Sequence, residues 1–328
     1  MTGLPAWLPE DLVLLDERCP LPLDRPFTAA GAQTLGVSRI LLRRLRERGL
    51  VREVVRGTYV ASQVRDTIEL RTWALRLVLP DSAIVADRTA AWLYGIDVLP
   101  RSAAHEPVPL DVFSRAESRI RRPGVASGVR ELRDTDVELV DGIPVTTPWR
   151  TALDLGRLLP RYDAIGALDA FLRLGVCEQE LAWGVHRFPG FRGVLQLREL
   201  VPIADPRAES MPESALRLHG RDAGLPPLQP QLSVCDRWGH EVYRLDLALP
   251  TLRYGAEYHG ERFHTGEDRE AYDMARAEQL ESDGWALDAF WKHDVYGPRA
   301  DPQARLRKGV VRARGRVGEW VPQGRFLP

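Results

Sequence analysis

Hydrophobic and polar positions near the N-terminus predict a helix–turn–helix followed by a β-hairpin. Thr28 is a good cap for a first short helix, and Ser38 caps a second helix that ends before Gly49. The apolar face expected for the second helix consists of Val37, Ile40, Leu41 and Leu45. Two short β-type runs follow, joined at Arg56-Gly57, which completes the order of a winged helix-turn-helix.

Helical and strand patterns alternate through the middle third of the chain. A helical stretch at 67–79 is followed by strand candidates within 108–145. Thr147 and Pro148 predict a helix start, because a capping hydroxyl precedes a ring whose φ already suits the first helical turn. This region has no catalytic spacing, and Asp154 on the expected helix is interpreted as a structural residue.

From residue 205 the pattern predicts the order α, β, β, β, α, β. A helix stops at Gly224, three strands follow, and a polar helix over 267–283 precedes the short strand ALDAFW. We therefore expect an α/β chain of the α+β multidomain class. The expected domains are a winged helix-turn-helix at 1–65, an α/β middle region of unknown role at 66–204, an αβββαβ core at 205–315 and a tail at 316–328.

The length of 328 residues and the 44% of apolar residues agree with two or three folded domains. The net charge of −1 hides local blocks: residues 38–60 carry seven arginines against two glutamates, and residues 299–325 carry eight basic residues against two acidic ones. Such segments suit a polyanion, although charge runs often only solvate a surface. The candidate DNA-contacting residues are Arg39, Arg43, Arg44, Arg46 and Arg56.

The cysteines and the apolar runs exclude several other classes. Cys19, Cys177 and Cys235 are isolated, so neither a disulfide framework nor a structural zinc site is expected. The first residues lack the positive region of a signal peptide, and no apolar run reaches the length needed to span a bilayer. We expect a cytoplasmic protein without a membrane partner.

Two acidic residues on neighbouring expected strands are candidates for a catalytic site. Asp246 and Glu257 stand on either side of a turn, where a hairpin can bring them together. Paired carboxylates suit Mg²⁺ (or Mn²⁺), which can polarise a phosphoryl oxygen and activate water. The alternatives are that Asp246 pairs with Arg244 and that Glu257 is a protective charge on an edge strand.

Histidines and a third acid adjoin this pair. His259 follows Glu257 at strand spacing, and His264 lies just beyond the turn at Gly260, so both could orient water or contact a phosphate. Glu213 is a further candidate on the preceding helix. Its alternative role is in a capping box with Ser210, and the two roles are compatible.

The blocks ESMPESALRLHGRDAGLP, YRLDLALP, EYHGERFH and DMARAEQLESDGW, in this order, resemble the Vsr-like (very short patch repair type) endonuclease domain of the PD-(D/E)XK superfamily. The resemblance covers roughly residues 205–315 and implies a restriction-endonuclease-like core. It also implies that Glu213, Asp246 and Glu257 are the site acids, while His259 occupies the usual lysine position. Many relatives carry an arginine on the last strand, where this chain has Ala289.

The N-terminal part, with PFTAAGAQTLGVSRILLRRLRERGLVREVVRGTYVA and the later TAAWLYGIDVLP, resembles the AbiEi-type antitoxin N-terminal domain over about residues 10–100. This resemblance implies a DNA-binding winged helix that represses its own operon. It also implies functional pairing with a nucleotidyltransferase toxin, without a stable complex.

Two functions therefore follow from the sequence. The first is a DNA-binding enzyme whose C-terminal domain hydrolyses phosphodiester bonds in double-stranded DNA, with Mg²⁺ held by Asp246 and Glu257. The alternative is a DNA-binding autoregulator or antitoxin of a type IV toxin–antitoxin system, with a nuclease domain that does not cleave.

Overall fold

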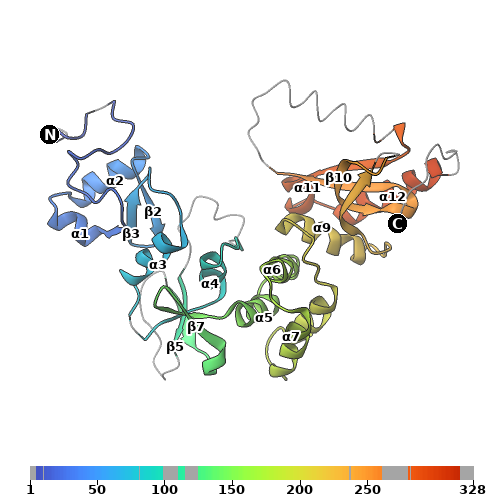
Figure 1. Cartoon of the computed structure of the whole chain (residues 1–328), viewed down its shortest axis with the longest axis horizontal. Helices are drawn as coiled ribbons and strands as arrows, with labels where there is room; N and C mark the ends of the chain where they lie inside the picture. The colour runs from blue at the N-terminus through green and yellow to red at the C-terminus, as the bar shows by residue number, and fades with distance from the viewer. Residues whose placement is uncertain are drawn as a thin grey trace. The chain divides into compact units, whose positions relative to one another are not determined.

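The computed structural model describes residues 5–9, 11–80, 82–98, 110–114, 125–235, 238–260, 280 and 282–317. The chain forms two compact units, Met1–Leu155 and Gly156–Pro328, and helix α5 (Pro148–Leu158) runs through the boundary between them. Both units combine helices with β-sheet, as Figure 1 shows, which confirms the expected mixed α/β class.

The first unit begins with the expected helix–turn–helix and hairpin. Its elements are β1 (Phe27–Thr28), α1 (Ala29–Thr34), α2 (Arg39–Glu47), β2 (Val51–Val55) and β3 (Thr58–Ala61). The Thr28 hydroxyl accepts from the Gly31 N–H at 3.0 Å, and the Ser38 hydroxyl accepts from Leu41 at 3.3 Å. The strands form an antiparallel sheet in the order β1-β3-β2. Both caps predicted from the sequence therefore set the starts of these helices.

The apolar face predicted for α2 is wrong at one position. Ile40 is 62% exposed, whereas Leu42 and Leu45 are buried in the core. Val37 precedes the helix, so counting helical periodicity from it placed the stripe wrongly. The inward stripe is centred on Leu42 and Leu45, and Ile40 lies on the opposite side of the helix.

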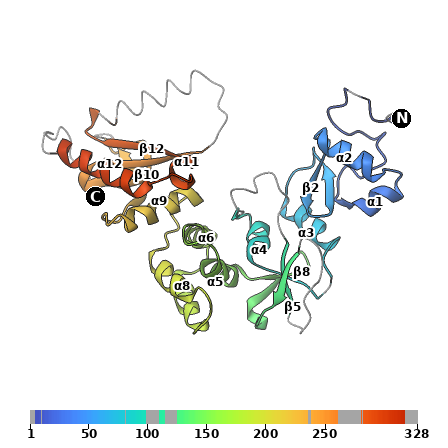
Figure 2. The same cartoon turned by 180° about the vertical axis from the view of Figure 1, so that it is seen from behind.

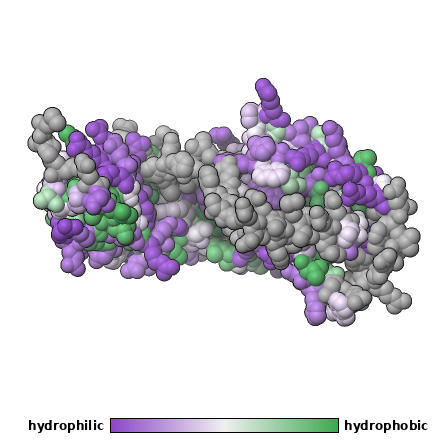
Figure 3. All heavy atoms as spheres, turned by 90° about the horizontal axis from the view of Figure 1, so that it is seen from above, coloured by the Kyte–Doolittle hydropathy of each residue, from purple (hydrophilic) through white to green (hydrophobic). Residues whose placement is uncertain are grey.

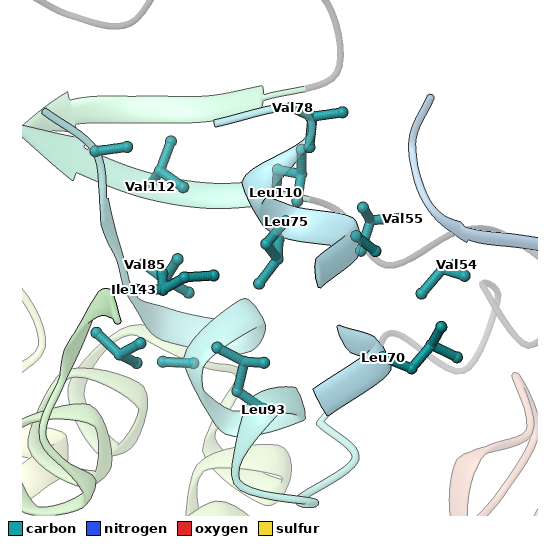
Figure 4. Close-up of a cluster of buried hydrophobic side chains, with 14 of the residues drawn as sticks. Val54, Val55, Leu70, Leu75, Val78, Val85, Leu93, Leu110, Val112 and Ile143 are labelled. Carbon is teal, nitrogen blue, oxygen red and sulfur yellow. The ribbon is translucent and has the colours of Figure 1, made fainter. Parts of the chain in front are cut away.

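The hairpin and the following α/β layer share one hydrophobic core, which Figure 4 shows. Side chains of Val54 and Val55 from β2 pack with Leu70 and Leu75 from helix α3 (Ile68–Arg76). Residues from the next sheet and from the helix beside it complete the cluster; they include Val85, Leu93, Leu110, Val112, Ile143 and Val145. The helix–turn–helix is therefore continuous with the layer that follows it.

The second sheet of this unit has five strands in the order β6-β5-β4-β8-β7. Its elements, with one helix, are β4 (Ile84–Val85), α4 (Asp87–Leu93), β5 (Leu110–Ser114), β6 (Val125–Val129), β7 (Val137–Val140) and β8 (Ile143–Thr146). Strands β4 and β8 are parallel, as are β5 and β6, while the other neighbours are antiparallel.

Asp154 on α5 is held in a buried ion-pair network, as expected for a structural residue. Its carboxylate accepts from the Arg150 guanidinium at 2.7 Å and from Arg130 at 3.0 Å. Arg150 also pairs with buried Asp136 at 2.8 Å, and Arg130 with Asp87 at 2.6 Å. Breaking one such pair leaves an uncompensated buried charge, so the network ties α5 to the start of α4 and to the segment between β6 and β7.

The second unit begins with helices and continues into a four-stranded sheet; Figure 2 shows it from behind. The helices are α6 (Arg161–Arg173), α7 (Glu178–Gly184), α8 (Val194–Leu200), α9 (Met211–Asp222), α11 (Lys292–Tyr296) and α12 (Pro302–Val317). The strands are β9 (Gln229–Cys235), β10 (Glu241–Leu249), β11 (Tyr254–His259) and β12 (Ala286–Trp291). The predicted order of helix, three strands and last strand is confirmed for these elements. Most of the polar helix expected over 267–283 lies outside the described residues.

The four strands form a sheet in the order β12-β11-β10-β9, parallel only between β11 and β12. Helix α9 packs against α6, where Arg217 forms an ion pair with fully buried Asp169 at 2.7 Å and Tyr162 stacks on His219. Helices α9 and α12 both contribute to the core over the sheet, with Leu216 and Leu306 beside Tyr254.

Among the residues coloured in Figure 3, hydrophilic side chains predominate and hydrophobic ones gather in a few patches. No helix among the described residues combines the length and apolarity needed to cross a membrane. Cys19, Cys177 and Cys235 are free thiols, as their isolation in the sequence predicted.

One glycine of α12 should be required by close packing. A Cβ on Gly309 would lie 2.0 Å from Asp288 Oδ2 and 2.6 Å from a Tyr254 ring carbon. Gly309→Ala is expected to lower the free energy of unfolding by about 1–3 kcal/mol, because the overpacked strand must move. Chemical denaturation followed by circular dichroism measures this loss.

Gly315 of the same helix is the matched control, because no atom lies within 4 Å of a Cβ placed there. Gly315→Ala should leave stability unchanged or raise it by up to about 1 kcal/mol through helix propensity. Equal stability for both alanine variants would contradict the packing argument.

Candidate functional site

Asp246 lies where strands β10 and β11 separate. Their antiparallel pairing ends at Leu247 and Ala256, and beyond this point the Asp246 carboxylate accepts from the Tyr258 N–H at 2.8 Å. Arg244, the partner suggested for Asp246 by strand spacing, instead pairs with Glu209 at 3.2 Å. The Asp246 carboxylate therefore replaces a backbone acceptor at the point where the two strands separate.

Glu257 lies on an interior strand, because β11 is flanked by β10 and β12. The alternative of a protective charge on an edge strand is therefore wrong. Its Oε2 atom accepts from the Tyr243 hydroxyl at 2.7 Å, and Tyr243 lies on the neighbouring β10. A carboxylate held on an interior strand is unusual, because such strands mostly carry apolar or paired side chains. Its presence at this position therefore calls for an explanation.

Glu213 takes part in the N-terminal cap of α9, but its carboxylate does not accept from the Ser210 N–H, as a full capping box requires. The Ser210 hydroxyl caps α9 by accepting from the Glu213 N–H at 3.4 Å. The Glu213 carboxylate is buried and accepts from the Glu209 N–H and the Gln231 amide, each at 2.9 Å. It is also close enough to Asp246 for its charge to affect that group.

The three acids form one electrostatic cluster centred on Asp246. The pKa of Asp246 is raised to about 7, chiefly by burial and also by the charges of Glu213 and Glu257, against the lowering effects of the Tyr258 N–H and His259. A carboxyl group titrating near neutral pH at a polar strand end is typical of functional sites.

The carboxylates of this cluster suit a cation bound by two protein ligands better than a site in which the protein supplies every ligand. Among the described residues, no group of three or more acidic, histidine or cysteine side chains is placed to hold one metal ion. Each of the three carboxylates already accepts a hydrogen bond. Mg²⁺ is commonly bound through one or two carboxylates with water or phosphate, so Asp246 and Glu257 remain chemically suitable ligands.

His259 ends β11 with an exposed side chain, and its ring stacks on Trp291 of the parallel neighbour β12 at a centroid distance of 5.3 Å. The imidazole therefore stands beside the acid cluster and is open to solvent. His264, the second expected histidine, lies outside the described residues.

Strand β12 has no arginine, but the side chain of Arg305 on α12 contacts it. The Arg305 guanidinium donates to the Ala289 carbonyl at 2.7 Å and lies over the Phe290 ring at 4.7 Å. It also pairs with Asp294 at 2.6 Å. This residue, together with Tyr243, Gln231 and Trp291, was missed in the sequence, where only the spacing of titratable groups was followed.

The arginines of the helix–turn–helix differ in availability. Arg39, Arg44 and Arg56 are exposed and make no ion pair within the described part of the chain. Arg43 approaches Glu47 only at 3.8 Å, whereas Arg46 pairs with Glu53 at 2.9 Å and lies over the Tyr59 ring. The exposed Ile40 adjoins these cations on α2. Four of the five predicted arginines are therefore open to a partner, whereas Arg46 is engaged in contacts with the hairpin.

Comparison with known proteins defines the class of the middle region. Residues 83–203, which begin at β4 and include α8, match the AbiEi antitoxin C-terminal domain. The antitoxin likeness of the sequence therefore extends through a region in which the residues alone indicated no role.

Uncharacterized proteins of Mycobacterium tuberculosis, from the strains CDC 1551 / Oshkosh and H37Rv, are each 35% identical to this chain over 267 residues. The alignments cover 81% of this chain and 94% of each relative. The chain belongs to the same family as these mycobacterial proteins.

The raised pKa of Asp246 predicts a pH-dependent loss of stability. The folded protein keeps a proton on this carboxyl up to about pH 7, whereas an unfolded Asp releases it near its ordinary pKa. Stability should therefore fall as pH rises from about 4 to 7. Asp246→Asn cannot ionise and should be about 2–4 kcal/mol more stable than the wild type at pH 8, with convergence at acid pH.

Denaturant titrations at several pH values test this expectation. Asp283→Asn, at an exposed position of the same unit, is the control and should follow the wild type. Asp111, whose pKa burial raises to about 6, should give a similar acid-side dependence in all three proteins. If Asp246→Asn also followed the wild type, the assigned electrostatic strain would be wrong.

Proposed function

We propose that this protein is a DNA-binding regulator of the AbiEi antitoxin type, which acts through its N-terminal helix–turn–helix. The match of residues 83–203 to the AbiEi antitoxin C-terminal domain is the observation that carries this proposal. The order of α1, α2 and the hairpin, joined to that region through a common core, supports it.

The exposed face of α2 has the chemistry that DNA recognition requires. Arg39 and Arg44 can neutralise phosphates or donate to guanine in the major groove. Ile40 is 62% exposed between them and offers an apolar contact of the kind made with the thymine methyl group. The exposed Arg56 at the hairpin turn would contact the backbone beside the groove.

The antitoxin role implies a toxin as functional partner. A nucleotidyltransferase toxin encoded beside this chain is the partner that the AbiEi resemblance favours, without a stable complex between the two proteins. In this function the helix–turn–helix would bind the promoter of the shared operon and repress it.

Arg44→Ala is expected to weaken binding to duplex DNA from the chain's own promoter region and to reduce the slope of log K against log salt by about one. The reason is the loss of one phosphate contact and its released counterions. Fluorescence anisotropy over a series of salt concentrations measures both quantities.

Arg198→Ala provides the control, since Arg198 is exposed on α8 and has no ion pair among the residues described. It should leave affinity and slope unchanged. Arg46→Ala should cost less than Arg44→Ala, because Arg46 already pairs with Glu53. An unchanged salt slope for Arg44→Ala would remove α2 from the DNA interface.

The acid cluster supports a second candidate function, Mg²⁺-dependent hydrolysis of DNA. Asp246 and Glu257 would hold the ion, which when bound would polarise a phosphoryl oxygen and acidify a water molecule. His259, exposed beside Asp246, would accept a proton from the attacking water. Glu213 would add a negative charge near the metal ligands. The close approach of Glu213 and Glu257 to Asp246 favours this candidate over a purely structural strand end.

Cleavage of plasmid and linear duplex DNA with Mg²⁺ or Mn²⁺ tests the second candidate. Asp246→Ala combined with Glu257→Ala should abolish cleavage, and His259→Ala should slow it by about 10²-fold or more. Arg198→Ala should cleave as the wild type does. Absence of cleavage, or cleavage that survives the double substitution, would reject the nuclease and leave the regulator proposal intact.

A further inference from the structure

Three aromatic rings gather at the carboxyl ends of β11 and β12. His259 and Trp291 are direct partners in the parallel strand pair, with ring planes 24° apart. Trp291 and His293, two residues further on in α11, have nearly parallel rings at a centroid distance of 6.4 Å and an angle of 11°. The rings come from two strands and a helix but share one orientation.

Contacts at the start of α11 fix the backbone of Trp291. The Trp291 N–H donates to the Asp294 carboxylate at 3.0 Å, which fixes the backbone where the strand turns into the helix. Asp294 is itself held by Arg305 at 2.6 Å. The backbone position of Trp291 is therefore set by contacts within the protein.

The outer part of the stack is open to solvent. Trp291 is 43% exposed, and the His293 side chain is 79% exposed. Exposure of this much aromatic surface costs free energy, which another flat ring could recover by stacking. His259 joins the stack to the acid cluster around Asp246.

Positive charge follows directly in the chain. Residues 299–316 carry seven basic residues against one acidic residue, and most lie on α12. Lys308 and Arg314 are exposed on that helix and have no ion pair among the described residues. Cationic side chains combined with stacked aromatic rings are the usual means of binding single-stranded nucleic acid.

We propose that Trp291, His259 and His293 form a stacking platform for unpaired nucleobases of single-stranded DNA. A base would extend the stack over the exposed rings, while the basic residues of α12 attract the strand's phosphates. The inference goes beyond both proposed functions, because it requires neither duplex binding by α2 nor cleavage. It gives the second unit a nucleic-acid contact of its own.

Binding of a fluorescently labelled oligothymidylate to the full-length protein, followed by anisotropy, tests this platform. Trp291→Ala should weaken binding by about tenfold, since stacking of one base on an aromatic ring is of this order. Trp291→Phe, which keeps an aromatic face, should stay within about threefold of the wild type. His293→Ala, at a side chain with little packing to lose, should also weaken binding.

Trp183→Ala is the matched control, because Trp183 is 79% exposed on α7 of the same unit. It should bind the oligonucleotide as the wild type does. Duplex binding should be unchanged in Trp291→Ala and weakened in Arg44→Ala, so the failure of one site is distinguished from the failure of the other.

The platform is rejected if the wild type does not bind the oligonucleotide, or if Trp291→Ala and Trp183→Ala have equal effects. Circular dichroism establishes that Trp291→Ala is folded. If it is not folded, His293→Ala decides instead: unchanged binding by that variant overturns the proposal.

Discussion

The first unit depends on a β-hairpin that is buried on both sides. Val51 and Ala61 pack into the core beneath α1 and α2, whereas Val54, Val55 and Val60 pack into the core of α3 and the five-stranded sheet. A hairpin so placed cannot move without opening one core or the other, because protein interiors are close-packed. The orientation of α2 is therefore fixed relative to the antitoxin-type sheet within this unit. DNA binding by α2 and any signal reaching that sheet would act on one body.

The second unit shows the same principle with a charged contact. Fully buried Asp169 on α6 binds Arg217 on α9 and also accepts from the Asp205 N–H at 2.7 Å. Helix α9 carries Glu213. The position of this acid therefore depends on α6, which lies within the antitoxin match at residues 83–203. Removal of either partner would leave a buried charge without compensation. The acid cluster is thus not independent of the part of the chain that precedes it.

The carboxylates around Asp246 are unfavourable for folding and are nevertheless held in place. Tyr243, Gln231 and the Tyr258 N–H each donate to one of them, which lowers the cost of burial without removing their mutual repulsion. Local conflict of this kind is expected at functional sites, where stability is given up for chemistry. A bound cation or a phosphate-bearing partner with its counterions would relieve the repulsion, which agrees with a role in handling nucleic acid.

The sequence by itself determined the elements whose causes are local. Hydroxyl caps at Thr28, Ser38 and Ser210 act over three residues, so these helix starts could be predicted from short segments. The order of helices and strands along the chain followed from local hydrophobic periodicity. Tertiary structure alone decided the partners of residues distant in sequence: Arg244 binds Glu209, and Arg305 reaches the strand that lacks an arginine. It likewise placed Glu257 on an interior strand and turned Ile40 outward. Pairing and burial depend on which elements meet in space, and no local pattern encodes that choice.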